Sequence, residues 1–443
     1  MDISFLPDFG NVVISIFAFV ALLSVIVAIH EYGHYIVGRW CGIHAEVFSL
    51  GFGPVLWSRM DRRGTKWQIA ALPFGGFVKF LGDANAASGY ADEQAMGGLS
   101  AEERRHTMHG APLWARAATV FAGPLANFIL AFLVFFGMLL SQGVVTEPLT
   151  IAQIYDLPQE HELEENDQIL KVEGIDIFDP ELSEKLDELT DRSSYTYTVE
   201  RGGQAMELSG PILVPARVTY TEPTLAAREA GVLEGDVIIA IEGMPVNRFA
   251  DLLDTIAERD GAPVTLEIWR AGEVIELTVS PTRRDLPLAN GDFETRWLIG
   301  VRGSYFFEPQ VESPGLIAAA MFSMEEIVWR LTTTVSGIYH MIVGEISTCN
   351  MSGPIGIAEI SGTAAKEGAV SFVLLIASIS LAIGFVNLLP IPILDGGHLM
   401  FFAVEAVTRR KLNERVAGNI MFLGMVLILT LMLFATSQDL FCP

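Results

Sequence analysis

Four apolar segments constrain the fold of this 443-residue chain more than any other feature. They cover roughly residues 11–29, 117–140, 371–393 and 419–436. A helix needs about 20 mostly apolar residues to cross the hydrocarbon core of a bilayer, and each segment is about that long. The sequence therefore predicts a polytopic α-helical membrane protein with about four transmembrane helices. The leader before the first segment contains Asp2 but no Lys or Arg, so a cleaved signal peptide is not expected.

A fifth apolar stretch, residues 314–343, carries charges in its middle. Glu325, Glu326 and Arg330 fall there, and a charge at the centre of a span costs about 2.5–3.5 kcal/mol on insertion scales. We expect this stretch to form an amphipathic helix on or beside the membrane.

Charge and hydrophobicity are segregated along the chain. It is 51% hydrophobic, has a mean hydropathy of +0.41, and still carries a formal net charge of -25. Most of the acidic residues lie between residues 142 and 320, which argues against nucleic acid as a partner. Lys and Arg cluster in the loops 38–116 and 409–415, so these loops are expected in the cytoplasm. The acidic block 142–370 and both termini then lie outside.

The acidic block contains two similar modules. Residues 216–285 predict a short helix, an apolar strand "VIIAIEG", an amphipathic helix "FADLLDTIAER" and a hairpin turning at Ala271-Gly272. Residues 148–213 repeat this order with lower fidelity. The string "AGVLEGDVIIAIEG" resembles bacterial PDZ domains, so a tandem PDZ pair is expected. Two unrelated β-rich modules remain the alternative.

The stretch "SVIVAIHEYGHYIVGRW" brings ionisable groups into an apolar segment. His30 and His34 are four residues apart, which places both imidazoles on one face of a helix. Glu31 lies beside that face. HExxH on a helix is typical of zinc proteases, in which the histidines bind the metal and the glutamate acts as base. The alternative is an interfacial cluster that merely marks the end of the helix.

A catalytic zinc needs a third protein ligand. Glu46 and His44 are near in sequence, but Asp395 in "NLLPIPILDGGHL" is the stronger candidate. Two prolines break the helical ladder there, and irregular backbone at membrane depth requires cover by protein or a cavity. The predicted topology puts Asp395 on the same side of the membrane as His34.

Taken together, these motifs resemble the site-2 proteases, which are membrane-embedded zinc metalloproteases. The resemblance covers nearly the whole chain and includes "FSLGFGP", "IAALPFGGFVKFLGD", "AGPLANF" and "MSGPIGIA". It implies one Zn²⁺ per chain, held by His30, His34 and Asp395, with Glu31 as the catalytic residue. It also implies a membrane-associated β-hairpin or sheet that receives the substrate as an added strand. The implied substrate-binding residues are Asn387, Pro390, Pro392, Gly75, Gly76, Phe77 and Val78. A cytoplasmic hairpin without a ligand is the alternative for that element.

The resemblance also implies the function and the location. The expected activity is hydrolysis of peptide bonds within single-span proteins of the bacterial inner membrane, as part of regulated intramembrane proteolysis in stress responses. Substrates would be an anti-sigma factor already cleaved outside, or remnant signal peptides. The periplasmic PDZ pair would exclude bulky substrates or bind peptide C-termini. A catalytically silent PDZ-bearing scaffold, and a protease that cuts soluble tails at the membrane surface, remain alternatives.

The expected organisation has five parts. An N-terminal membrane core covers 1–142, the first PDZ domain 143–215, and the second 216–285. A periplasmic region with amphipathic helices covers 286–370, and the C-terminal membrane core covers 371–443.

The three cysteines give no disulfide framework. Cys349 and Cys442 should both face outside, where a disulfide is conceivable, but two free thiols are the simpler expectation. For His398, just after the "LDGG" motif, a packing or supporting role is expected.

Overall fold

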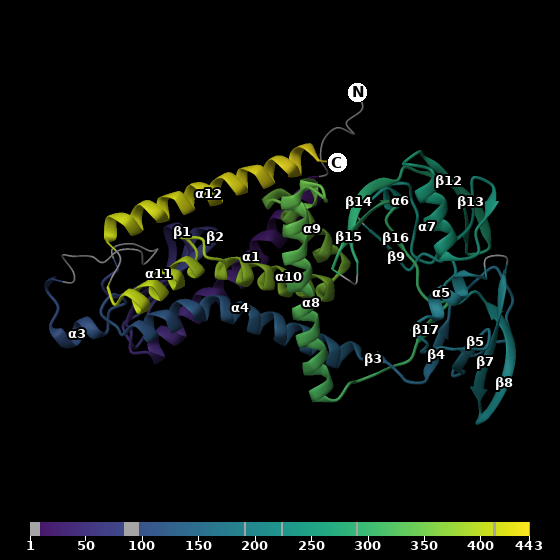
Figure 1. Cartoon of the computed structure of the whole chain (residues 1–443), viewed down its shortest axis with the longest axis horizontal. Helices are drawn as coiled ribbons and strands as arrows, with labels where there is room; N and C mark the ends of the chain where they lie inside the picture. The colour runs from purple at the N-terminus through teal and green to yellow at the C-terminus, as the bar shows by residue number, and fades with distance from the viewer. Residues whose placement is uncertain are drawn as a thin grey trace. The chain divides into compact units, whose positions relative to one another are not determined.

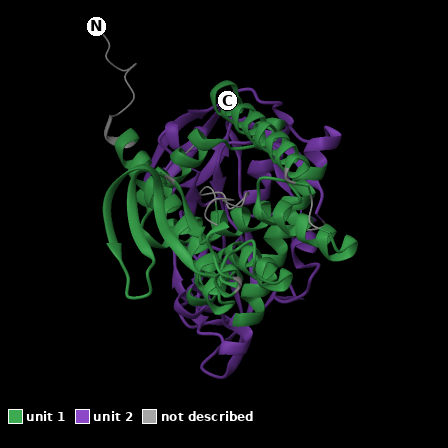
Figure 2. Cartoon of the chain, turned by 90° about the vertical axis from the view of Figure 1, so that its left-hand side faces the viewer, with its two compact units in different colours: residues 1–137, 320–339, 348–443 green, residues 138–319, 340–347 purple. Residues whose placement is uncertain are grey.

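The computed structural model describes residues 9–83, 97–189, 192–222, 225–288, 291–410 and 413–442. These fall into two compact units, shown in different colours in Figure 2. Unit 1 comprises residues 1–137, 320–339 and 348–443, and unit 2 comprises residues 138–319 and 340–347.

Within the described residues, four helices are long and apolar enough to cross a membrane (Figure 1). They are α1 (Phe9–Trp40), α4 (Leu113–Gln142), α10 (Ala369–Leu388) and α12 (Glu414–Phe441). Each predicted span therefore corresponds to one of these long apolar helices, although the ends of the helices differ from the predicted bounds. α1 continues to Trp40, so His30 and His34 lie inside the helix and not at its end. α10 stops at Leu388, because the residues that follow contain Pro390 and Pro392.

In the described part of the chain, four further helices lie wholly or largely in unit 1. α8 (Leu316–Val343) is the predicted amphipathic helix, and it is not among the four candidate spans. Its Ile327 packs with Phe135 of α4 and Leu381 of α10. Its Arg330 bonds Glu326 and donates to the hydroxyl of Ser378, so both charged groups have partners beside apolar helices. The others are α3 (Ala101–Arg105), α9 (Pro354–Glu367) and α11 (Asp395–Thr408).

Unit 1 also contains a sheet made from two long strands, β1 (Ala45–Met60) and β2 (Lys66–Phe80). Both strands bend back on themselves. Ser49 pairs with Gln68 on one side and with Phe77 on the other, while Ser58 also pairs with Gln68. The segment 45–50 is thus central, and 76–80 forms an edge of the sheet.

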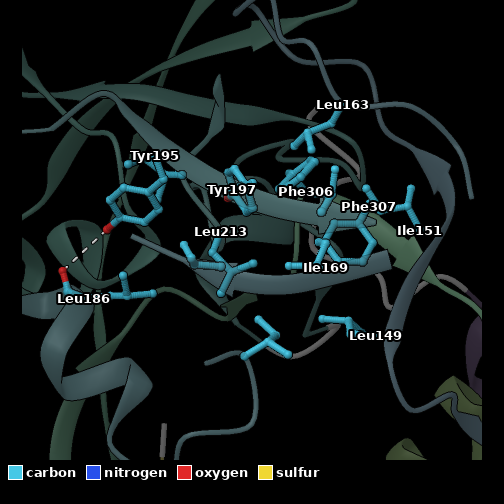
Figure 3. Packing of buried hydrophobic residues seen from close by; sticks show 14 of the residues in the cluster. Leu149, Ile151, Leu163, Ile169, Leu186, Tyr195, Tyr197, Leu213, Phe306 and Phe307 are labelled. Atoms are coloured by element: carbon cyan, nitrogen blue, oxygen red, sulfur yellow. Dashed lines mark hydrogen bonds between the residues drawn. The ribbon is translucent and has the colours of Figure 1, made fainter. Parts of the chain in front are cut away.

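The first module of unit 2 is built on an antiparallel sheet, in which the late strand β17 lies at the edge beside β4. Its strands follow the order β17 (Phe307–Pro309), β4 (Leu149–Ile154), β5 (Gln168–Val172), β7 (Ser194–Arg201) and β8 (Gln204–Pro211), with β6 (Ile175–Asp176) paired to β5 and α5 (Leu182–Asp187) alongside. Figure 3 shows its buried core, in which Tyr195 donates its hydroxyl to the carbonyl of Leu186 at 3.4 Å. Tyr197 is fully buried and donates to the carbonyl of Pro211, so its polar atom is satisfied inside the core.

The second module repeats the predicted order of elements. Its sheet runs β11 (Met244–Pro245), β10 (Val237–Ile241), β12 (Val264–Arg270) and β13 (Glu273–Val279), and helices α6 (Ala226–Glu229) and α7 (Phe249–Glu258) pack with it. Ala271 and Gly272 both have positive φ, as a two-residue hairpin turn requires. The predicted hairpin is confirmed. Short strand pairs join β3 (Val144–Val145) to β18 (Val311–Glu312), β9 (Tyr220–Thr221) to β16 (Val301–Arg302), and β14 (Thr282–Pro287) to β15 (Phe293–Leu298).

The two modules share the same polar network at equivalent positions. Arg201 binds both oxygens of Asp167, and Arg270 binds both oxygens of Asp236, across the same separation of 34 residues. Glu173 accepts the backbone N–H of Thr196, and Glu242 accepts that of Thr265, across the same separation of 23 residues. These matches favour an internal repeat over two unrelated modules.

A disulfide in unit 1 corrects the expectation of two free thiols. Cys349 and Cys442 are bonded, with their Cα atoms 5.5 Å apart, whereas Cys41 is free. The adjacent Asp439 accepts hydrogen bonds from the backbone N–H groups of Gly353, Ile355 and Gly356 at 2.7–3.1 Å. A covalent bond and a charged helix cap therefore both hold the end of α12 to the start of α9. Sequence reasoning missed the pairing because nothing local brings the two cysteines together.

Candidate metal centre

Helix α1 places two imidazoles side by side. The Nε2 atoms of His30 and His34 lie 3.1 Å apart, and the two ring centroids 4.8 Å apart. This is the geometry that spacing i, i+4 predicts for one face of a helix.

Asp395 joins these histidines from the N-terminus of α11. Its Oδ2 atom lies 3.1 Å from Nε2 of His30 and 3.6 Å from Nε2 of His34. The backbone around the break between α10 and α11 is so closely packed that the two residues after Asp395 must be glycines. A Cβ on Gly396 would lie 2.2 Å from the carbonyl oxygen of Leu389, and one on Gly397 only 2.3 Å from that of Ile391.

The three side chains fit a zinc ion. One ligand atom from each lies within 4.8 Å of the others. Ligands at about 2.0–2.1 Å from a tetrahedral zinc stand about 3.3 Å apart, close to the three distances observed. Among the described residues, no donor hydrogen-bonds the buried Oδ2 of Asp395. A buried acceptor facing two imidazole nitrogens is costly unless a cation lies between them.

The remaining nitrogen of His34 is fixed by helix α4. The Nδ1 atom of His34 lies 2.9 Å from the carbonyl oxygen of Thr119, so Nδ1 must donate. The neutral ring then presents the lone pair of Nε2 towards Asp395 and His30, as a metal ligand requires.

Asn127 of α4 orients the ring of His30, as Thr119 orients that of His34. No role was predicted for Asn127 from the sequence. Its amide nitrogen lies 3.3 Å from Nδ1 of His30, while its buried Oδ1 has no hydrogen bond within the described residues. The O and N atoms of an amide are assigned from the hydrogen-bond network. If the O and N atoms of the Asn127 amide are exchanged, Oδ1 accepts a hydrogen bond from Nδ1 of His30. The Nε2 atom of His30 then keeps its lone pair for a metal. An amide side chain within an apolar segment was the available signal in the sequence.

Glu31 lies between the histidines and the edge strand of the sheet. Its carboxylate accepts a hydrogen bond from the backbone N–H of Val78. A Cβ on Gly76 would approach Cγ of Glu31 to 3.1 Å, so the missing side chain lets the strand run close to the acid. Gly76, Phe77 and Val78 thus lie beside Glu31, and Gly75 precedes them with φ of +146°.

The other predicted residues lie around the break between α10 and α11. Asn387 is in the last turn of α10, and Pro390 and Pro392 lie in the segment that returns to Asp395. Pro392 also contacts Gly424 of α12. Burial lowers the pKa of His398, which keeps this imidazole neutral and agrees with the expected supporting role.

The two alternative third ligands lie elsewhere. Glu46 pairs with Lys79 at 3.0 Å, and His44 lines a separate cavity near the end of α1. Of the described His, Cys, Asp and Glu residues, only His30, His34 and Asp395 form a cluster suited to a metal.

A buried ion pair holds α11 against α4. Arg116 donates two hydrogen bonds to the carboxylate of Glu405, at 2.7 and 3.1 Å, and lies over the ring of Phe402. Gly123 provides the other close contact, because a Cβ there would lie 2.3 Å from Nε2 of His34. α4 therefore positions all three members of the cluster. The arrangement combines a site for a Lewis acid with an adjacent carboxylate base, as metal-assisted peptide hydrolysis requires.

Comparison with known proteins agrees with this chemistry. The model of Peptidase family M50 matches residues 18–431. A protein of Agrobacterium fabrum named as a zinc metalloprotease is 35% identical, over 95% of this chain and 94% of its own. The regulator of sigma-E protease RseP of Salmonella typhimurium is 30% identical, over 95% of this chain and 97% of its own. The chain therefore belongs to peptidase family M50, the site-2 proteases, and is a zinc metalloprotease of the inner membrane.

Proposed function

We propose that one zinc ion per chain is held by His30, His34 and Asp395, and that Glu31 is the general base. The observation that carries this proposal is the convergence of two imidazole nitrogens and one buried carboxylate oxygen within 4.8 Å, with Glu31 on the adjacent turn. The hydrogen bonds of His34 to Thr119 and of His30 to Asn127 would orient the rings for that role.

The bound metal supplies a Lewis acid that activates water and polarises a peptide carbonyl. The carboxylate of Glu31 accepts the proton of the attacking water and delivers it to the nitrogen of the leaving amine. The N–H of Val78 holds Glu31 in place without occupying both carboxylate oxygens. The apolar walls of α1, α4 and α10 limit the access of bulk water, which strengthens the electrostatic interactions inside.

We further propose that the substrate binds as an added strand at residues 76–80 of β2. A transmembrane helix satisfies its own backbone groups, so it must unwind before a peptide bond becomes accessible. The edge of the sheet runs beside Glu31 and offers backbone partners for the unwound segment. Asn387, Pro390 and Pro392 would contact the same segment from the broken end of α10.

The natural substrates are proposed to be single-span proteins cut within the span. The Salmonella relative is named as a regulator of sigma-E, which favours an anti-sigma factor already trimmed outside, and remnant signal peptides share the same chemistry. We assign the repeated modules, residues 143–215 and 216–285, to a periplasmic PDZ pair that excludes bulky substrates or binds peptide C-termini. The basic loops 38–116 and 409–415 favour an active site near the cytoplasmic side.

The test is cleavage of a single-span model protein, trimmed outside, by the purified full-length chain. Wild type should cut within the span, and Glu31→Gln should abolish cleavage while zinc remains bound. Glu102→Gln is a matched control, because Glu102 is an exposed acid of α3 that lies outside the metal cluster and outside the proposed substrate edge. A chelator should remove activity from wild type, and added zinc should restore it.

Three results would contradict the proposal. Full activity of Glu31→Gln would remove Glu31 from the chemistry. A zinc-loaded wild type that cuts no tested span would favour the scaffold alternative, and cleavage restricted to soluble tails would favour a surface protease.

A further inference from the structure

A cavity lies at the end of α1, apart from the metal centre. Its volume is about 380 Å³, and it is enclosed by the last turn of α1, the start of β1, the turn between β1 and β2, and α3. Cavities of this size accommodate small ligands or a lipid headgroup.

The lining of this cavity has more basic than acidic side chains. It includes the side chains of Arg39, Arg63, His44 and His106. Within the described part of the chain, Glu103 contributes the only carboxylate of the lining, and its Oε2 already accepts the N–H of Ser100 in a helix capping box. Several cations around one space repel one another unless an anion lies between them.

The carboxylate of Asp61, which interacts with Arg39, already accepts several hydrogen bonds. Asp61 accepts the backbone N–H groups of Arg63 and Thr65 on Oδ1, and the indole of Trp67 on Oδ2. Arg39 donates one hydrogen bond to the hydroxyl of Tyr35 at 2.8 Å and attracts the carboxylate of Asp61 electrostatically, and a guanidinium has further N–H donors for a ligand.

The imidazole of His106 is also oriented for an anion. Its Nδ1 lies 2.7 Å from the carbonyl oxygen of Gly42 and must therefore donate to it. The ring stands against the backbone of Gly42, whose positive φ of +81° is one that glycine adopts readily. Only the imidazolium form of His106, which carries a proton on both nitrogens, can donate from Nε2 to a phosphate oxygen.

The cavity lies at the level where spans end. α1 ends at Trp40, which is 76% exposed and directly follows Arg39, and α4 begins beside Trp114, which is 66% exposed. Exposed tryptophans at the ends of spans mark the headgroup region of a bilayer. Basic cavities at this level bind the headgroups of anionic lipids.

We propose that this cavity binds a phosphate group, as carried by the headgroup of an anionic phospholipid, with Arg39, Arg63 and His106 as its donors. Arginine matches phosphate through parallel N–H donors. The site lies at the end of the helix that carries His30 and His34, so bound lipid would hold this end of α1 at the headgroup level.

The test uses detergent-solubilised, full-length protein and native mass spectrometry. One arm titrates dioleoyl phosphatidylglycerol against dioleoyl phosphatidylcholine, and the other titrates inorganic phosphate. Arg63→Gln and Arg39→Gln/Arg63→Gln should each bind phosphatidylglycerol more weakly, by about fivefold for each arginine removed. Arg62→Gln is the matched control, because Arg62 is exposed, neighbours Arg63 and does not line the cavity.

The outcomes separate the sources of phosphate. Weaker binding of phosphatidylglycerol by the cavity variants, with unchanged binding by Arg62→Gln, supports a lipid site. Binding of inorganic phosphate alone, with the same dependence on Arg63, supports the phosphate site with a soluble ligand. Equal binding by all variants, or an equal loss in Arg62→Gln, overturns the proposal. Arg63 is exposed, so Arg63→Gln carries the test even where the double variant fails to fold.

Discussion

The Oδ2 atom of Asp395 lies 3.1 Å from the Nε2 atom of His30, although the two residues stand near opposite ends of the chain. This contact forms only when the break after α10 packs against α1 and α4. Zinc binding should therefore report on the assembly of the whole membrane unit and not on α1 alone.

Asn127 should tune the metal affinity through His30. We expect Asn127→Ala to weaken zinc binding by about 10–100-fold, since it removes the partner that orients the imidazole. Asn127→Asp should retain affinity, because a carboxylate oxygen can still accept the N–H of Nδ1. The measurement is competition for zinc with a chromophoric chelator. Unchanged affinity in Asn127→Ala would show that other contacts orient the ring.

Gly123 should tolerate no side chain. In Gly123→Ala the new methyl group would meet Nε2 of His34 at 2.3 Å, so zinc content and cleavage should both fall to background. Gly137→Ala provides the control on the same helix, because no other group lies within 4 Å of its Cβ position. That variant should keep zinc and activity. Metal analysis and circular dichroism of both variants decide the matter, and normal zinc content in Gly123→Ala would contradict the geometry.

The disulfide should protect two of the three cysteines. Without reductant, an alkylating reagent should label Cys41 and leave Cys349 and Cys442 unmodified, and with reductant all three should react. The bond closes a sequence separation of 93, so the Cys349→Ser/Cys442→Ser variant should lose about 2–5 kcal/mol of stability. Mass spectrometry gives the labelling, and thermal unfolding gives the stability. Labelling of Cys349 and Cys442 before reduction would rule the bond out.

Asp167 should make the first module sensitive to acid. Burial alone would raise the pKa of this carboxyl, but the guanidinium of Arg201 and the N–H of Glu164 outweigh burial and hold the pKa below its ordinary value. A lowered pKa stabilises the fold at pH values above the unfolded pKa of about 3.9, and this stability is lost as the pH falls through the folded pKa. Asp167→Asn should therefore cost about 1–3 kcal/mol at pH 7, and the difference from wild type should shrink towards pH 3.

Hydrogen exchange of β5 and β7 in the full-length protein measures this effect. Glu165→Gln is the control, because Glu165 is exposed and only two residues away. A difference between Asp167→Asn and wild type that stays constant from pH 7 to pH 3 would contradict the assignment.

Several features followed from the sequence because they depend on a short window of residues. A run of about 20 apolar residues must be helical in a bilayer whatever surrounds it, so the existence of four spans was predictable. The spacing of His30 and His34 determines their common face, and the Ala271-Gly272 turn determines a hairpin.

Other features depended on contacts between distant segments, which only the tertiary structure decided. The sequence alone left Glu46, His44 and Asp395 as candidates for the third ligand, and it assigned no role to Asn127. Whether such side chains meet at one site depends on how closely α1, α4 and α10 pack against one another. Glycines allow this approach, as where Gly33 of α1 meets Ala122 of α4. The disulfide and the edge of β2 likewise follow from packing between remote segments. Hydropathy and spacing are local properties, whereas the meeting of remote groups depends on the packing of the whole unit.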